Sequence, residues 1–115
     1  MSAPNLLDLS RLDAALGGDR GLMTEILQMY ESTAAMDVEE LSQAVEDGNV
    51  DTVVRRAHAI KGASGNVGAD AVMDVAGRIE RAGRDGELEQ ALALVPDLRA
   101  AFAETLAASQ AYRAA

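Results

Sequence analysis

Apolar side chains recur at intervals of three and four residues through most of this 115-residue chain, and no stretch alternates convincingly with a period of two. Spacing of three and four places side chains on one face of an α-helix. Glycine-containing stretches such as Gly17-Gly18 and Gly48-Asn49 interrupt the periodicity and indicate turns. The pattern therefore predicts five helices, over residues 9–16, 20 to about 47, about 50 to 66, about 69 to 83 and about 87 to 112.

The longest of these segments, residues 20–47, carries an imperfect apolar stripe. Asp37 interrupts its face, and we expect either Met36 or Val38 to cover the gap. A helix with one apolar face buries that face against its neighbours. The residues that we expect to point inward are Leu22, Ile26, Tyr30, Thr33, Leu41 and Val45.

The three following segments have stripes of their own. Pro96 lies inside the last one, where it lacks a backbone donor and crowds the preceding turn, so it should kink or divide that helix or begin a short loop. The expected inward residues are Val50, Val53, Ala57, Ile60, Ser64 and Val67 in the first segment, Val72, Val75, Ala76 and Ile79 in the second, and Leu88, Leu92, Val95, Leu98 or Arg99, Phe102 and Leu106 in the third.

Together these stripes predict an all-α fold, an antiparallel four-helix bundle with a short additional N-terminal helix. The length fits one domain, which we assign to residues 1–115. Such a bundle covers its own stripes, so we expect a monomer. The chain has no cysteine, which excludes disulfides and thiolate metal ligands.

No apolar run in the sequence is long enough to span a membrane. Residues 1–5 lack the charged region followed by an apolar stretch that is typical of a secretory signal. We therefore expect a cytoplasmic protein without a membrane partner.

The formal net charge of −9 argues against nucleic acid as a partner, because phosphate backbones attract basic surfaces. The charge is unevenly distributed along the chain. Eleven acids and two bases give −9 in residues 1–51, three acids and six bases give +3 in residues 52–84, and five acids and two bases give −3 in residues 85–115. Charge alone leaves two interpretations open, a functional positive surface or ordinary solvated helix faces.

The only histidine and the only lysine lie three residues apart inside the positive segment, as His58 and Lys61. Gly62 is four residues after His58 and Gly65 is seven, so both share its helical face, and Arg55 lies on the same side. An imidazole nucleophile beside a compact cation suits the handling of a phosphoryl group. Glycine in a helix weakens it but leaves room for a partner's reactive group.

Other interpretations of His58 weaken on inspection, although a lone helical histidine is usually an ordinary surface residue. A zinc site normally needs three or four protein ligands, and here only carboxylates could join the imidazole. A Ser-His-Asp triad has no support, because Ser64 lacks the sequence context of a nucleophile elbow. The remaining alternatives are a surface histidine and a phosphoryl-accepting one.

The run from Arg56 to Ala69, RAHAIKGASGNVGA, resembles the signature of histidine-containing phosphotransfer (HPt) domains. In that signature an Ala-His pair precedes an aliphatic residue, Lys-Gly, a small residue, a serine and, after a short gap, Gly-Ala. The stretch from Arg78 to Arg84 resembles the following helix of the family, and Leu16-Gly17-Gly18-Asp19 resembles its usual entry into the second helix. The resemblance therefore covers most of the chain.

The resemblance implies a helical bundle in which His58 is the phosphorylated residue, Lys61 an electrostatic helper, and Gly62 the clearance for docking. It also places Glu80 where the family often has a glutamine or glutamate near the histidine. Whether Glu80 hydrogen-bonds the ring stays open at this point. We expect Arg55, Gly65 and Arg84 to contribute to the docking of a partner.

By the same resemblance the chain is a phosphoryl carrier in a phosphorelay rather than a self-sufficient enzyme. His58 would accept a phosphoryl group from an aspartate of a response-regulator receiver domain and pass it to another receiver, with a hybrid histidine kinase as a further partner. No cofactor is expected on this chain, since the receiver supplies the magnesium. The alternative is a helical adaptor that binds a receiver domain without phosphotransfer.

Overall fold

The computed structural model describes residues 6–115, and the expectation about a secretory signal in residues 1–5 lies outside this range. The described residues form five α-helices and no strand. The helices are α1 (Ser10–Ala15), α2 (Arg20–Asp47), α3 (Val50–Asn66), α4 (Asp70–Arg84) and α5 (Leu88–Ala114). Their bounds agree with the segments that the apolar periodicity predicts, to within one or two residues.

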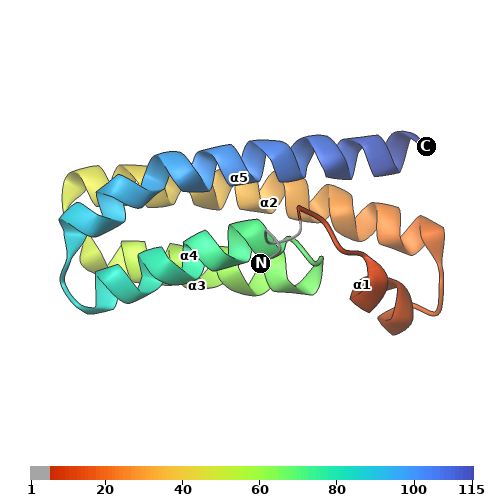
Figure 1. Ribbon diagram of the computed structural model, residues 1–115, viewed down its shortest axis with the longest axis horizontal. Helices are drawn as coiled ribbons and strands as arrows, with labels where there is room; N and C mark the ends of the chain where they lie inside the picture. The colour runs from red at the N-terminus through yellow and green to blue at the C-terminus, as the bar shows by residue number, and fades with distance from the viewer. Residues whose placement is uncertain (1–5) are drawn as a thin grey trace, which may run out of the picture.

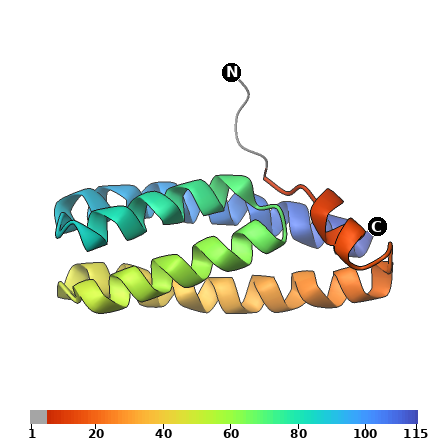
Figure 2. The same ribbon diagram turned by 90° about the horizontal axis from the view of Figure 1, so that it is seen from below.

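Helices α2 to α5 form an antiparallel bundle, and α1 lies at one end of it beside the beginning of α2 (Figures 1 and 2). Contacts join α2 to α3, α3 to α4, α4 to α5, and α5 back to α2, so that the four long helices surround one core. The short turns between consecutive helices require this antiparallel arrangement. The predicted fold class is confirmed.

Local sequence accounts for where the helices begin and end. The side chains of Asp19 and Asn49 accept hydrogen bonds from the backbone amides of Leu22 and Thr52, which caps the N-termini of α2 and α3. Gly48 ends α2 with a φ of 70°, in the left-handed region that glycine adopts without strain. The turn between α2 and α3 is therefore encoded by Gly48-Asn49.

The buried residues confirm the expected inward face of α4 and most of that of α3. In α2 they confirm Tyr30, Leu41 and Val45, but not Leu22 and Thr33. Leu22, Thr33 and Met36 are exposed, and the gap is covered by Val38, which is buried. Helix α2 contacts both α3 and α5, so small residues and Met23 also point inward. Its buried apolar residues are Met23, Leu27, Tyr30, Ala34, Val38, Leu41, Ala44 and Val45.

Two expectations about inward residues need correction, and the structure decides between the alternatives at Pro96. Val50 and Leu92 are exposed, because each lies near the beginning of its helix at the rim of the bundle. Pro96 does not divide α5, which continues from Leu88 to Ala114. The missing donor affects a single hydrogen bond, and the first part of the α5 ribbon slopes relative to its straight remainder (Figure 1).

None of the helices formed by residues 6–115 combines the length and apolarity that crossing a membrane requires.

Candidate functional site

His58 lies midway along α3, between residues that hold this helix in the core. Ala57 and Ile60 are completely buried, and their phase turns His58 outward. The His58 side chain is 66% exposed. The helix thus presents the imidazole to solvent while its neighbours fix the backbone beneath it.

One carboxylate on the next helix gathers three cationic or hydrogen-donating groups. Glu80 of α4 is buried, with only 6% of its side chain exposed. Its Oε2 lies 2.9 Å from Nδ1 of His58 and 2.8 Å from an η-nitrogen of Arg84, and its Oε1 lies 2.6 Å from Nζ of Lys61. The contact between Glu80 and the His58 ring, which the sequence left open, is therefore present.

The ionisation of Glu80 decides how the imidazole holds its proton. Burial alone would raise the pKa of Glu80, but hydrogen bonds from Lys61, Arg84 and His58, with the charge of Lys61, lower that pKa to about 2. An ionised carboxylate can only accept hydrogen bonds. We therefore assign the proton to Nδ1 of His58, which leaves the Nε2 lone pair on the exposed side chain.

A hollow of about 420 Å³ lies beside His58 between α3 and α4. Lys61, Glu80 and Arg84 line it, and so do three residues that the sequence analysis did not select, Gly77, Arg81 and Asp85. A glycine inside an otherwise amphipathic helix was the available signal for Gly77. The hollow brings four expected site residues together and opens onto solvent.

The other expected docking residues lie outside this cluster. Arg55 is exposed one turn before His58, and an η-nitrogen contacts Oγ1 of Thr52 at 3.3 Å. Gly62 is exposed, and a Cβ added there would meet nothing within 4 Å. Gly65 is half-buried, and a Cβ there would lie 3.0 Å from Sδ of Met73, so this glycine also accommodates a side chain of α4.

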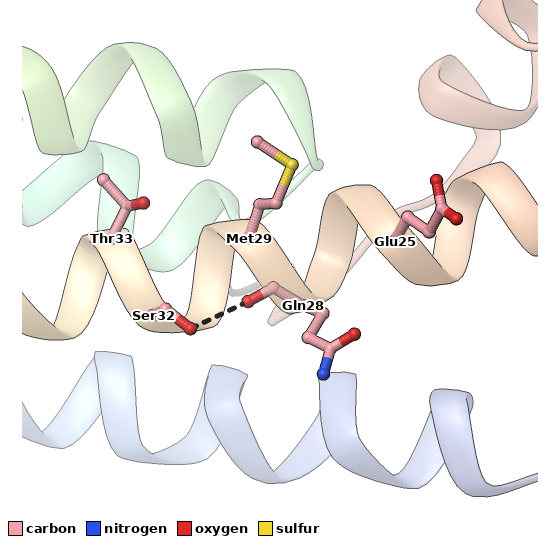
Figure 3. Close-up of a pocket in the computed structure, with 5 residues that line it drawn as sticks. All are labelled: Glu25, Gln28, Met29, Ser32 and Thr33. Carbon is pink, nitrogen blue, oxygen red and sulfur yellow. Dashed lines mark hydrogen bonds between the residues drawn. The ribbon is translucent and has the colours of Figure 1, made fainter.

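A larger hollow of about 530 Å³ lies on α2 and contains none of the expected site residues. Its lining comes from one helix, with Met29 and Gln28 pointing in different directions from the α2 ribbon (Figure 3). The Ser32 hydroxyl there donates to the backbone carbonyl of Gln28, and the lining includes neither an imidazole nor a cationic side chain, so we place the candidate chemistry at His58. Among residues 6–115 no three His, Cys, Asp or Glu side chains are grouped as they would be to hold a metal ion.

Comparisons with known proteins agree with the fold. The model of the Hpt domain family matches residues 25–111, which include His58 and Glu80. The crystal structure of histidine-containing phosphotransfer protein B from Pseudomonas aeruginosa PAO1 is similar to this chain with a TM-score of 0.89. The two are 26% identical, and the similarity covers 98% of this chain and 97% of that one.

A curated relative gives a similar result over a shorter length. The phosphorelay intermediate protein rdeA of Dictyostelium discoideum is 33% identical over 82 residues. The match covers 71% of this chain and 32% of rdeA, so it spans about a third of that relative's length.

Proposed function

Because the chain belongs to the Hpt domain family, we propose that it is a phosphorelay intermediate of two-component signalling. His58 accepts a phosphoryl group from the aspartate of a receiver domain and passes it to the aspartate of a second receiver. The chain is a phosphoryl carrier, and its partners are response-regulator receiver domains or the receiver of a hybrid histidine kinase. We place it in the cytoplasm as a monomer.

The observation that carries this proposal is the hydrogen bond between Nδ1 of His58 and Oε2 of Glu80. With the proton held on Nδ1, the lone pair of Nε2 attacks the phosphorus of the receiver's phosphoaspartate. The Nε2–P bond forms as the P–O bond breaks, and the aspartate leaves as a carboxylate. The Nδ1 proton stays in its hydrogen bond to Glu80, and the reverse sequence returns the phosphoryl group to a receiver.

The cations around Glu80 favour the arrival of a phosphoryl group. Lys61 and Arg84 together outweigh the single charge of Glu80, so the group enters a locally positive site. Lys61 lies one helical turn from His58, from where its ammonium can offset charge on the transferring oxygens. A receiver brings its own magnesium to this reaction.

Docking follows from the surface around His58. The exposed Gly62 leaves open space beside the ring, and Arg55 and Arg84 add positive charge to the approach. Gly65, near the end of α3, extends this surface by having no side chain. Gly62→Gln should obstruct the receiver and slow transfer, whereas Ala103→Gln at an exposed position of α5 should not; equal rates in the two variants would contradict the clearance role.

The proposal is tested with radiolabelled phosphorylated receiver domains from the same genome. The label should move to the chain as an acid-labile, alkali-stable adduct, and His58→Gln, which removes the only histidine, should abolish it. A second receiver added afterwards should take the label away. Binding to receivers without transfer from any of them would contradict the carrier function and favour the adaptor.

A further inference from the structure

Gly77 lies in the interior of α4, where glycine is among the poorest helix formers. It belongs to no turn, and its φ is not in the left-handed region. Close packing explains a neighbouring glycine of the same helix, because a Cβ at Gly83 would lie 2.9 Å from Cγ2 of Val54. At Gly77 the nearest atom to an added Cβ is not a core atom but Cδ of Lys61, a residue of the candidate site.

A Cβ added at Gly77 would lie 3.4 Å from Cδ of Lys61. The aliphatic stem of Lys61 therefore crosses α4 over Gly77 before its ammonium meets Oε1 of Glu80 at 2.6 Å. Gly77 precedes Glu80 by three residues, so the two share one face of the helix. Gly77 also lines the hollow that contains His58.

We propose that Gly77 is a positioning residue for phosphoryl transfer, because it keeps open the path along which Lys61 reaches Glu80 beside His58. The inference rests on the proposed function in that Lys61 serves the transferring group. Gly77 touches no reacting atom and acts through Lys61. It adds to the site a residue whose contribution is the absence of a large side chain.

The size of the side chain at residue 77 decides the outcome. Alanine would bring its Cβ into ordinary van der Waals contact with the Lys61 stem and would improve the helix. A leucine or methionine side chain would extend beyond that contact and occupy the path, while the open hollow gives it room without disturbing the core. Stability and transfer should therefore respond in opposite directions as the residue is enlarged.

The first measurement compares the rates of phosphoryl transfer from a labelled receiver to the wild type and to variants at residue 77. We expect Gly77→Ala to raise the melting temperature by about 4 °C and to keep the rate within about twofold of the wild type. Gly77→Leu and Gly77→Met should remain folded and lose about tenfold in rate. Ala93→Leu, at an exposed position of α5, is the matched control and should transfer normally.

A double-mutant cycle separates positioning from a general structural effect. Lys61→Ala should slow transfer about tenfold, and adding Gly77→Leu to it should cause no further loss. Multiplication of the two losses in the double variant would overturn the proposal, because Gly77 would then act independently of Lys61. A wild-type rate in Gly77→Leu and Gly77→Met would overturn it as well.

The second measurement does not depend on transfer and keeps the proposal testable if no receiver labels the chain. The pKa of Glu80 is about 2, and Lys61, Arg84 and His58 all hydrogen-bond its carboxylate. Losing Lys61 from Oε1 should raise the pKa of Glu80 towards its usual value of 4.5 in both Gly77→Leu and Lys61→Ala, and not in Gly77→Ala. Carbon-13 NMR titration of the Glu80 carboxyl, assigned with Glu80→Gln, reports this. An unchanged pKa in Gly77→Leu would refute the positioning role whatever the outcome for the relay.

Discussion

Two buried glutamates of this bundle have similar hydrogen-bond partners and different surroundings. Glu80 on α4 binds His58, Lys61 and Arg84, whereas Glu31 on α2 binds Ser109 and Arg113 of α5. Arg113 contacts both oxygens of Glu31 through Nε at 2.7 Å and an η-nitrogen at 2.8 Å, and Oγ of Ser109 lies 2.6 Å away. The pKa of each carboxyl is lowered by these partners.

The partners differ in their exposure to solvent. Ser109 is completely buried and the Arg113 side chain is 24% exposed, whereas the side chains of His58 and Arg84 are 66% and 60% exposed. The Glu31 cluster is closed between two helices and serves to hold α5 against α2. Around Glu80 the hydrogen-bond partners His58 and Arg84 face the solvent, so an incoming phosphoryl group can reach the His58 ring. Exposure of the partners, rather than the buried carboxylate itself, separates the Glu31 cluster from the candidate site around Glu80.

The largest expected effect comes from removing the outward cluster's carboxylate. Glu80→Ala should slow phosphoryl transfer to His58 on the order of 10–100-fold, as expected when the carboxylate that orients a histidine is lost. The unfolding free energy should change much less, because His58 and Arg84 can rehydrate at the surface. Transfer rates from a labelled receiver and urea unfolding measure the two quantities. A variant that is badly destabilised but transfers normally would reverse the assignment of the two regions.

Glu31→Ala should have the opposite effect. It leaves Arg113 and the buried Ser109 without their acceptor, and we expect the free energy of unfolding to fall by about 2 kcal/mol. The rate of transfer to His58 at a temperature where the variant is folded should match that of the wild type. Glu104→Ala, at an exposed position of α5, provides the control in urea unfolding. Slow transfer in a fully folded Glu31→Ala would show that the closed cluster is coupled to the site.

The pH dependence of stability tests whether both carboxylates are held ionised. The pKa of Glu80 is about 2 in the folded chain against a usual value of 4.5, so its contribution is fully present above about pH 4.5 and is lost as the pH falls towards 2. Because three exposed or half-exposed groups hold it and solvent screens their charges, we expect a contribution of about 1 kcal/mol or less rather than the full linkage value. Urea unfolding between pH 7 and 2.5 should show a shallower decline in Glu80→Gln than in the wild type. An identical decline would contradict the ion cluster.

The direction is the same for Glu31, whose pKa is lowered chiefly by Arg113 and then by Ser109 against the effect of burial.

The fold was predictable where a helix buries a single, mostly aliphatic face. Val53, Ala57 and Ile60 of α3 follow strict helical spacing and are all completely buried. The inward face of α2 includes the polar Glu31, Asp37 and Ser42, so hydrophobicity alone misplaced Leu22 and Thr33. Its polar Asp37 is buried because an η-nitrogen of Arg56 pairs with it at 3.1 Å, a compensation that requires knowing the α2–α3 contact.

For the candidate site, the sequence singled out the proposed nucleophile more directly than the residues around it. His58 and Lys61 are single members of their residue types at helical spacing, which a sequence displays directly. The contact of Glu80 with the ring depends on the register of α4 against α3, and periodicity within one helix does not determine that register. The sequence did not point to Gly77 for the same reason, because the close approach of Gly77 to Lys61 is a contact between α4 and α3.

The smallest expected effect concerns Tyr30, which precedes Glu31 in α2 and hydrogen-bonds Ser64 of the helix that carries His58. The two hydroxyls lie 2.8 Å apart in the core, and burial raises the pKa of Tyr30 to about 12. Tyr30→Phe should lower the free energy of unfolding by about 1 kcal/mol, because the Ser64 hydroxyl loses its partner but can turn to a carbonyl of its own helix.

Removing Ser64 as well, in Tyr30→Phe with Ser64→Ala, should recover part of that loss, since no unpaired hydroxyl then remains buried. Tyr112→Phe is the matched control, because its hydroxyl meets only Sδ of Met23 at 3.8 Å. Urea unfolding measures each variant, and transfer to His58 should stay within about twofold of the wild type, because neither hydroxyl contacts Glu80 or the ring. A larger drop in transfer would mean that the hydrogen bond between Tyr30 and Ser64 couples the region around Glu31 to α3, the helix that carries His58. The two glutamate clusters would then not act independently.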